Sequence, residues 1–195
     1  MSKRLFDWVM SSLGLLALGP ILVLIALAVK LDSPGPVFFR QERVGRFGQP
    51  FRIHKFRTMR HEPAGKGLQI TVGADRRITR VGHFLRASKL DELPQLLDVW
   101  QGTMSLVGPR PCLFNQEELI DERAKRGVFD ARPGITGLAQ VQGIDMSTPC
   151  LLAETDAKML AGLSIATYFR YILATVTGSG RGDRIQSQPN DGSGR

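Results

Sequence analysis

The chain has 195 residues, a length that suits one domain with its own core and excludes two large ones. Its hydrophobic fraction of 43% and charged fraction of 23% exclude a wholly disordered chain and a polytopic transporter. Lysine and arginine number 26 against 18 acidic residues, and the net charge of +8 indicates an anionic partner such as lipid head groups, nucleic acid or a phosphorylated substrate.

An uncharged apolar segment dominates the N-terminal part of the chain. Residues 9–29 contain no charged side chain, and as a straight helix they would extend about 31 Å, close to the thickness of a bilayer's hydrocarbon core. Gly19 and Pro20 lie in the middle of the segment. Because proline removes a backbone donor and clashes with the preceding turn, we expect a kink or break there.

The charges that flank this segment bear on its topology. Lys3 and Arg4 precede it, and a dense basic run follows between Lys30 and Arg60. A spanning helix should have asymmetric flanks, whereas a helix that enters and leaves by the same face needs basic residues on both sides. The pattern therefore favours a re-entrant helix-break-helix over residues 1–31, with both ends on the cytoplasmic side.

Two other interpretations of the segment remain open at this stage. Its length also allows a single transmembrane span. Ala26-Leu27-Ala28 resembles a cleavage site, so a removed signal peptide is the other alternative.

In the rest of the chain, the sequence predicts strands first and helices after them. Alternation and turn residues predict strands at 37–39 and 51–59, a loop at 61–77 and a turn-rich loop at 132–137. Apolar spacing predicts helices within 78–100 with a break near Ser88, at 116–126 and at 151–177. Together these predict an α-rich α+β domain over residues 32–177, followed by a disordered tail at 178–195. The three histidines match no metal motif, so we assign them no chemistry.

Two adjacent carboxylates, Asp91 and Glu92, stand in a basic neighbourhood and have two interpretations. In the structural one, the segment 88–91 has the spacing of a capping box, and Asp91 caps a helix start. In the functional one, the two carboxylates hold Mg²⁺ and attack or activate a phosphoryl centre.

Two arginines lie in rigid turns, Arg110 within Gly108-Pro109-Arg110-Pro111 and Arg132 before Pro133-Gly134. An arginine held in this way loses little entropy when it grips a phosphate with two hydrogen bonds, which suits recognition of a diphosphate. The alternative for each motif alone is a surface arginine beside a proline.

Five features in this order resemble the bacterial sugar transferases known as monotopic phosphoglycosyl transferases. They are the apolar segment with its central proline, Lys55-Phe56-Arg57-Thr58-Met59, Leu90-Asp91-Glu92-Leu93-Pro94-Gln95, Ser105-Leu106-Val107-Gly108-Pro109-Arg110-Pro111 and Arg132-Pro133-Gly134-Ile135-Thr136-Gly137. The resemblance covers roughly residues 1–145. It departs from the family at the bend, where Gly19-Pro20 stands in place of the usual Ser-Pro pair, and it weakens beyond residue 145.

The resemblance implies a monotopic membrane protein with a small catalytic domain on the cytoplasmic face of the bacterial inner membrane. Its activity would be transfer of a sugar-1-phosphate from a UDP-sugar to a polyprenol phosphate with release of UMP, as the first membrane step of glycoconjugate synthesis. Membrane lipids, and not nucleic acid, would be its other partners, and a homodimer is left open.

The resemblance also assigns roles to residues. Asp91 would be the nucleophile and a ligand of Mg²⁺, and Glu92 its partner in the dyad. Substrate binding would fall to basic and turn residues, namely Lys55, Arg57, Pro109, Arg110, Pro111, Arg132, Pro133 and Gly134. The competing hypotheses are a non-catalytic basic protein that binds anionic lipid or nucleic acid, and a secreted hydrolase behind a signal peptide.

Overall fold

The computed structural model describes residues 3–60 and 77–177. This part is about 59% helical and holds two small sheets, which confirms an α-rich mixed fold. The predicted tail at 178–195, and all of the predicted loop at 61–77 except Arg77, lie outside the described residues.

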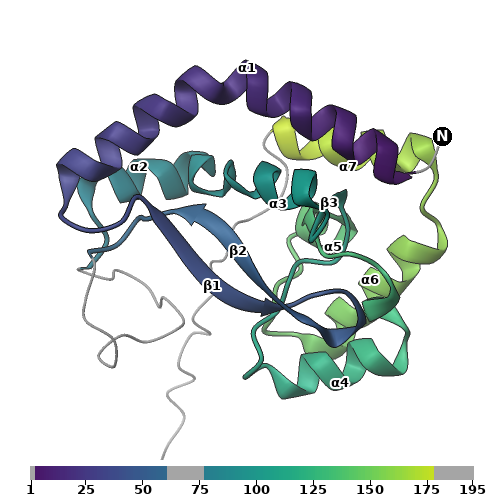
Figure 1. Cartoon of the computed structure of the whole chain (residues 1–195). Coiled ribbons are helices and arrows are strands. Elements are labelled where there is room, and N and C mark those ends of the chain that lie inside the picture. The colour runs from purple at the N-terminus through teal and green to yellow at the C-terminus, as the bar shows by residue number, and fades with distance from the viewer. Residues whose placement is uncertain (1–2, 61–76, 178–195) are drawn as a thin grey trace, which may run out of the picture.

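The helix α1 (Lys3–Asp32) forms one side of the molecule and arches over most of the other elements (Figure 1). It continues through Gly19 and Pro20, so the predicted helix-break-helix is wrong. The kink or break expected there takes the form of a bend within one helix (Figure 1). A proline inside a helix removes one hydrogen bond, and the arch accommodates that loss. Among the described residues, α1 is the helix long and apolar enough to cross a membrane.

The N-terminal part of α1 is attached to the rest of the protein through a buried carboxylate. Asp7 is 3% exposed and accepts hydrogen bonds from the Ser105 hydroxyl at 2.8 Å and the Leu106 backbone N–H at 3.1 Å. The Tyr168 hydroxyl donates to it as well. A buried carboxylate is costly unless it is hydrogen-bonded, so these donors hold the helix to a strand and to a second helix.

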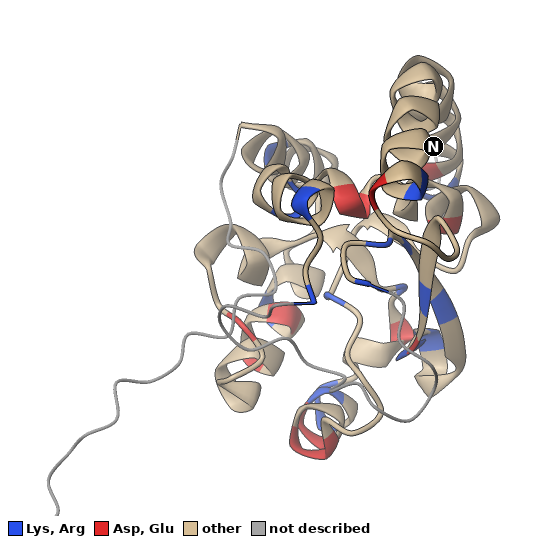
Figure 2. Ribbon diagram, turned by 90° about the vertical axis from the view of Figure 1, so that its left-hand side faces the viewer, with Lys and Arg blue, Asp and Glu red and all other residues tan. Residues whose placement is uncertain are grey.

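A hairpin of β1 (Phe38–Val44) and β2 (Pro50–Phe56) follows α1, and its antiparallel register pairs Gln41 with Ile53. Both predicted strands exist, but the bounds differ: β1 extends to Val44 beyond the predicted 37–39, and β2 ends at Phe56, before the end of the predicted 51–59. Its turn contains the short helix η1 (Arg46–Gly48). Figure 2 shows basic positions along this hairpin.

The region 78–100 forms two helices, α2 (Arg80–Ser88) and α3 (Gln95–Gln101), as predicted. Lys89 adopts a left-handed conformation, with φ of 58°, and ends α2 there. The short helix η2 (Leu90–Glu92) joins the two.

The C-terminal half packs helices around a second, parallel sheet. The strands β3 (Ser105–Val107) and β4 (Gly134–Thr136) form it, so the loop predicted at 132–137 contains a strand. The helices are α4 (Glu117–Lys125), η3 (Val128–Asp130), α5 (Leu138–Gln142), α6 (Pro149–Ala161) and α7 (Ile165–Val176). The predicted helix at 116–126 is confirmed, and the one at 151–177 is divided in two, because Ser164 forms a capping box at the start of α7.

Glycines allow β3 and β4 to approach closely. The Gly108 N–H donates to the Thr136 carbonyl, and the Gly134 N–H donates to the Pro109 carbonyl, each at 2.8 Å. A Cβ atom at Gly134 would lie 2.0 Å from the Gly108 nitrogen. The two proline-arginine motifs, which are distant in the sequence, are therefore joined backbone to backbone.

We expect Gly134→Ala to lower the free energy of unfolding by about 3 kcal/mol, because two backbones must separate to admit the methyl group. Thermal unfolding in detergent measures this change. Gly162→Ala is the matched control, since its nearest atom would be an ordinary contact at 3.5 Å. Equal melting temperatures for the two variants would contradict the close approach.

Candidate active site

Asp91 and Glu92 lie in η2, between the end of α2 and the start of α3, and both are half-buried. Neither η2 nor α3 begins with a side-chain cap. The Ser88 hydroxyl donates hydrogen bonds to the Phe84 and Leu85 carbonyls of its own helix, α2. The capping box predicted over 88–91 is therefore wrong, because Ser88 is the last residue of α2 and the turn at Lys89 separates it from the helix that follows.

Glu92 is held by two cations that come from different parts of the fold. The Lys55 ammonium of β2 lies 2.9 Å from its Oε1 atom, and the Arg110 guanidinium lies 2.6 Å from the same oxygen. All three side chains are between 13% and 18% exposed, which makes the pairs stronger than surface ion pairs. The structure thus joins three residues that the sequence singled out separately.

A buried ion pair supports Arg110 from behind. The Arg123 guanidinium donates to the Arg110 carbonyl at 2.8 Å and to the Asp156 carboxylate at 2.6 and 3.0 Å. Arg123 and Asp156 are each 1% exposed. Burial raises the pKa of Asp156, and the Arg123 guanidinium opposes that rise. Our sequence analysis missed Arg123, although its place four residues after Leu119 on one helix face was a usable signal.

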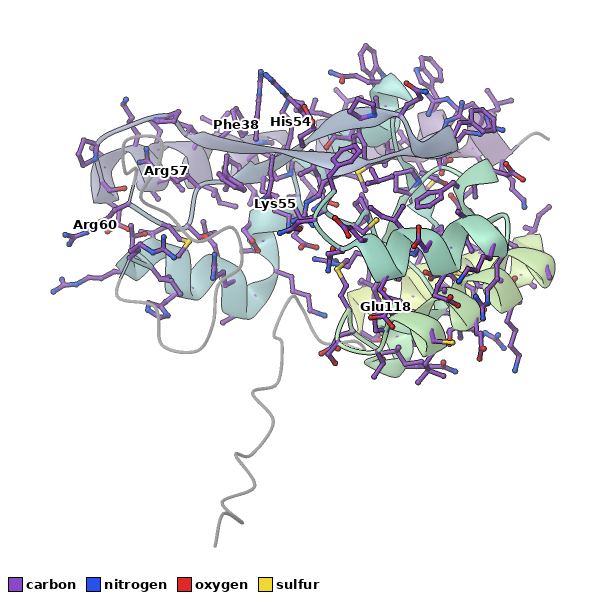
Figure 3. The ribbon with its side chains drawn as sticks, turned by 90° about the horizontal axis from the view of Figure 1, so that it is seen from below. Phe38, His54, Lys55, Arg57, Arg60 and Glu118 are labelled. Carbon is purple, nitrogen blue, oxygen red and sulfur yellow. The ribbon has the colours of Figure 1, made fainter. Side chains whose placement is uncertain are left out.

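Arg57 lies apart from the Glu92 cluster. Figure 3 shows Lys55 near the centre of the molecule and Arg57 on the side where α1 ends. The Arg57 Nη2 atom donates to the Val29 carbonyl at 3.2 Å and to the Ser33 carbonyl at 2.6 Å, so this side chain fastens the end of α1. Burial lowers the pKa of Arg57, and Asp32 opposes the shift. Its substrate-binding role stays a prediction.

Arg132 supports the other end of the helix that follows the dyad. Its Nε atom donates to the Gly102 carbonyl at 2.8 Å, directly after α3, and Arg4 donates to the Trp100 carbonyl nearby. Burial lowers the pKa of Arg132, with Arg46 and Arg4 adding to the effect. Cations stabilise a helix end of this kind because its last carbonyls carry partial negative charge. Pro133 and Gly134 fix the backbone beside it.

His54 and Asp98 join β2 to α3, and His54 is the residue before Lys55 on the strand. The Asp98 carboxylate accepts the His54 backbone N–H at 2.9 Å, and its other oxygen lies 2.6 Å from the His54 ring. Burial raises the pKa of Asp98, and the contacts with His54 oppose the shift. This pair positions the strand that carries Lys55, a role that isolated sequence positions do not reveal.

Comparison with known proteins assigns the chain to a family. The sequence profile described as bacterial sugar transferase matches residues 1–181. The chain belongs to the bacterial sugar transferase family. This confirms the resemblance drawn from the five sequence features.

Three curated relatives show the range of this family. The chain is 49% identical to a UDP-glucose:undecaprenyl-phosphate glucose-1-phosphate transferase of Caulobacter vibrioides over 73% of the chain and 54% of the relative. It is 43% identical to the exopolysaccharide production protein PSS of Rhizobium leguminosarum over 87% of the chain and 84% of the relative. It is 40% identical to a UDP-N-acetylgalactosamine-undecaprenyl-phosphate N-acetylgalactosaminephosphotransferase of Aeromonas hydrophila over 71% of the chain and 33% of the relative. The chain thus spans about half of the first of these proteins and a third of the last.

We expect Arg123→Met to lower the free energy of unfolding by about 3–5 kcal/mol, because it leaves the Asp156 carboxylate buried without its partner. Thermal unfolding in detergent tests this. The double variant Arg123→Met/Asp156→Leu should recover most of the loss, since no buried charge remains. Lys125→Met, at a 66% exposed side chain on the same helix, is the control and should change little. A double variant as unstable as the single one would contradict the ion-pair account.

Proposed function

We propose that this sugar transferase moves a sugar-1-phosphate from a UDP-sugar to a polyprenol phosphate, releases UMP and uses Asp91 as a covalent nucleophile. The relatives named above for UDP-sugars and undecaprenyl phosphate support the substrates. Their different sugars, glucose and N-acetylgalactosamine, leave the sugar of this chain undetermined. The relative named for exopolysaccharide production supports a role in glycoconjugate synthesis.

The observation that carries the proposal is that Glu92 brings two cations together next to Asp91. Glu92 is tied to Lys55 and Arg110, and its charge is balanced by them. Asp91 is the adjacent residue in the same short helix. By pairing with Lys55 and Arg110, Glu92 holds two cations beside Asp91, where they can meet the phosphate that a carboxylate nucleophile attacks. This arrangement supports Asp91 as the attacking group and Glu92 as its partner.

The reaction has two displacements at one phosphorus. In the first, an Asp91 carboxylate oxygen bonds to the β-phosphorus of the UDP-sugar, and the bond from that phosphorus to the bridging oxygen breaks. UMP leaves with that oxygen and its electron pair. In the second, an oxygen of the polyprenol phosphate bonds to the same phosphorus, and the bond to Asp91 breaks. The carboxylate is regenerated, and the product is a polyprenyl-diphosphate-linked sugar. Lys55 and Arg110 face the charge that develops.

The residues around Asp91 fit a magnesium ion only if the substrate phosphates supply some of its ligands. Among the described residues, no group of three or more His, Cys, Asp or Glu side chains is placed to hold a metal ion. Mg²⁺ is commonly held by one or two carboxylates together with substrate phosphates. Asp91, with Glu92 next to it, would supply the protein's oxygen ligands. The ion, when bound, would supply charge neutralisation for the diphosphate and the departing UMP.

The attachment of α1 supports a re-entrant placement in the cytoplasmic leaflet. Asp7 near one end and Val29 near the other both contact the same globular body. A Cβ atom at Gly14, between them, would lie 3.3 Å from Leu96 in α3. A straight span would carry the two ends to opposite sides of the bilayer, which these contacts oppose. The outward apolar side chains of α1 then face lipid, and Leu13, Leu16, Leu24 and Leu27 are more than half exposed.

The helix α7 extends the same apolar face. Ile165, Leu173 and Val176 are 64% to 78% exposed, and Phe169 packs edge-on against Phe6 of α1. Figure 1 shows α7 close to α1. An amphipathic helix beside an apolar one suits the membrane interface, where a lipid-borne phosphate arrives.

We expect Asp91→Asn to abolish UMP release from detergent-solubilised protein given Mg²⁺, undecaprenyl phosphate and a panel of UDP-sugars, because an amide oxygen is a poor nucleophile. Without the lipid acceptor, the wild-type protein should retain the phosphosugar on the peptide that contains Asp91, which mass spectrometry detects.

The control is Asp121→Asn, the same change at an exposed position on α4, which should leave turnover and membrane binding unchanged. Equal UMP release from the Asp91 variant and the wild type would overturn the proposal. Absence of release with every sugar from folded wild-type protein would instead favour a non-catalytic protein that binds anionic lipid.

A further inference from the structure

A buried amide beside the dyad lacks the partner that its burial demands. Gln95 begins α3, three residues after Glu92, and is 2% exposed. Its side-chain Nε2 atom has no hydrogen-bond partner among the described residues. Native proteins rarely leave a buried donor unsatisfied, and the loss costs about 1–3 kcal/mol. A ligand that supplies an acceptor would remove this cost.

Gln95 lines a small hollow whose other polar walls are cationic. Arg43, Lys55 and Arg110 surround the hollow, with Ile53 and Pro111 completing it. Of the described residues, none that lines the hollow is acidic, although Glu92 pairs with Lys55 and Arg110 from outside the lining. Glu92 offsets one of these three positive charges, so a net positive charge remains in a partly enclosed space and attracts an anion. The oxygens of an anion are the acceptors that an amide N–H requires. The charge and the unsatisfied donor therefore indicate the same class of ligand.

We propose that the Gln95 amide donates a hydrogen bond to a phosphate oxygen of the bound substrate, an inference that rests on the proposed transferase function. The three cations attract the phosphate from any direction, whereas an amide donor on a buried, rigid helix start selects one orientation. Such a donor would turn the phosphorus toward Asp91 without adding charge to the hollow. Gln95 is thus a substrate-positioning residue.

Two substrates carry this chemistry, the diphosphate of the UDP-sugar and the phosphate of the polyprenol. They react in separate half-reactions, so their steady-state constants distinguish them. A loss in kcat/KM for the UDP-sugar alone assigns the amide to the first half-reaction, and a loss for the lipid phosphate alone assigns it to the second. A loss in both assigns it to the phosphate that the two steps share.

The test replaces Gln95 with methionine, which has a similar shape and no donor. Gln95→Met should keep or raise the melting temperature of the unliganded protein, because it removes an unsatisfied buried group. It should also lower kcat/KM roughly ten- to a hundredfold, the effect of losing one hydrogen bond to a charged group. Gln101→Met, at the exposed other end of α3, is the matched control for both measurements. If Gln95 were merely structural, Gln95→Met would lower the melting temperature and kcat/KM together.

A second readout needs no turnover. Inorganic pyrophosphate, in buffer free of divalent cations, should raise the melting temperature of the wild type and of Gln101→Met, and raise that of Gln95→Met less. Gln95→Glu, which offers an acceptor in place of the donor, should be stabilised least.

The outcomes distinguish a failure of the role proposed for Gln95 from a failure of the proposed transferase function. Turnover that depends on Asp91 but is unchanged in Gln95→Met would overturn the role of Gln95 and leave the transferase intact. Pyrophosphate stabilisation that is weakened in Gln95→Met, without UMP release from the wild type, would support the phosphate contact and overturn the transferase. If pyrophosphate raised the melting temperature of Gln95→Glu by as much as that of the wild type, the proposed role of Gln95 as a hydrogen-bond donor would be overturned.

Discussion

The helix α1 is attached to the body of the protein at both of its ends, and this double attachment fixes where every other element lies relative to the apolar face. Near the N-terminus, the Asp7 carboxylate is buried and satisfied by Ser105, Leu106 and Tyr168. Near the C-terminus, the Arg57 guanidinium holds the last carbonyls of the helix. Either end can leave the body only by exposing or unpairing a buried charge, which costs several kcal/mol. The apolar outer face of α1 and the candidate site are therefore held in one fixed relation, as the proposed transfer to a lipid-borne phosphate requires.

Around this frame the site is assembled from three separate pieces of chain. The hairpin contributes Lys55, the short helix η2 contributes Glu92, and the loop after β3 contributes Arg110. Each piece is supported from behind, the hairpin by the pair of His54 with Asp98, and the loop by Arg123. Rigid support of this kind lowers the entropy lost when the cations grip a substrate. The buried groups that carry no chemistry of their own thus decide how well the charged ones work.

The sequence predicted local structure better than it predicted contacts. It anticipated the break near Ser88 and both strands of the hairpin, because turn residues and alternation act over a few positions. It missed the strand within 132–137, since β4 exists only through its pairing with β3. It also predicted a kink or break at Pro20, where the helix bends and stays continuous. Arg123 and Gln95 acquire their importance from burial, which no single motif reports.

By itself, the sequence determined the family, the apolar N-terminal helix and the residues that carry charge near the dyad. These follow from local composition and from the order of motifs along the chain. Only the tertiary structure decided that Glu92 is shared by Lys55 and Arg110, that Arg57 fastens α1, and that Arg132 supports the end of α3. The sequence shows where an arginine or lysine stands, but it does not show which group the side chain contacts. Its partner is chosen by the packing of segments that lie tens of residues apart, so that partner cannot be inferred from the residue's neighbours in the sequence.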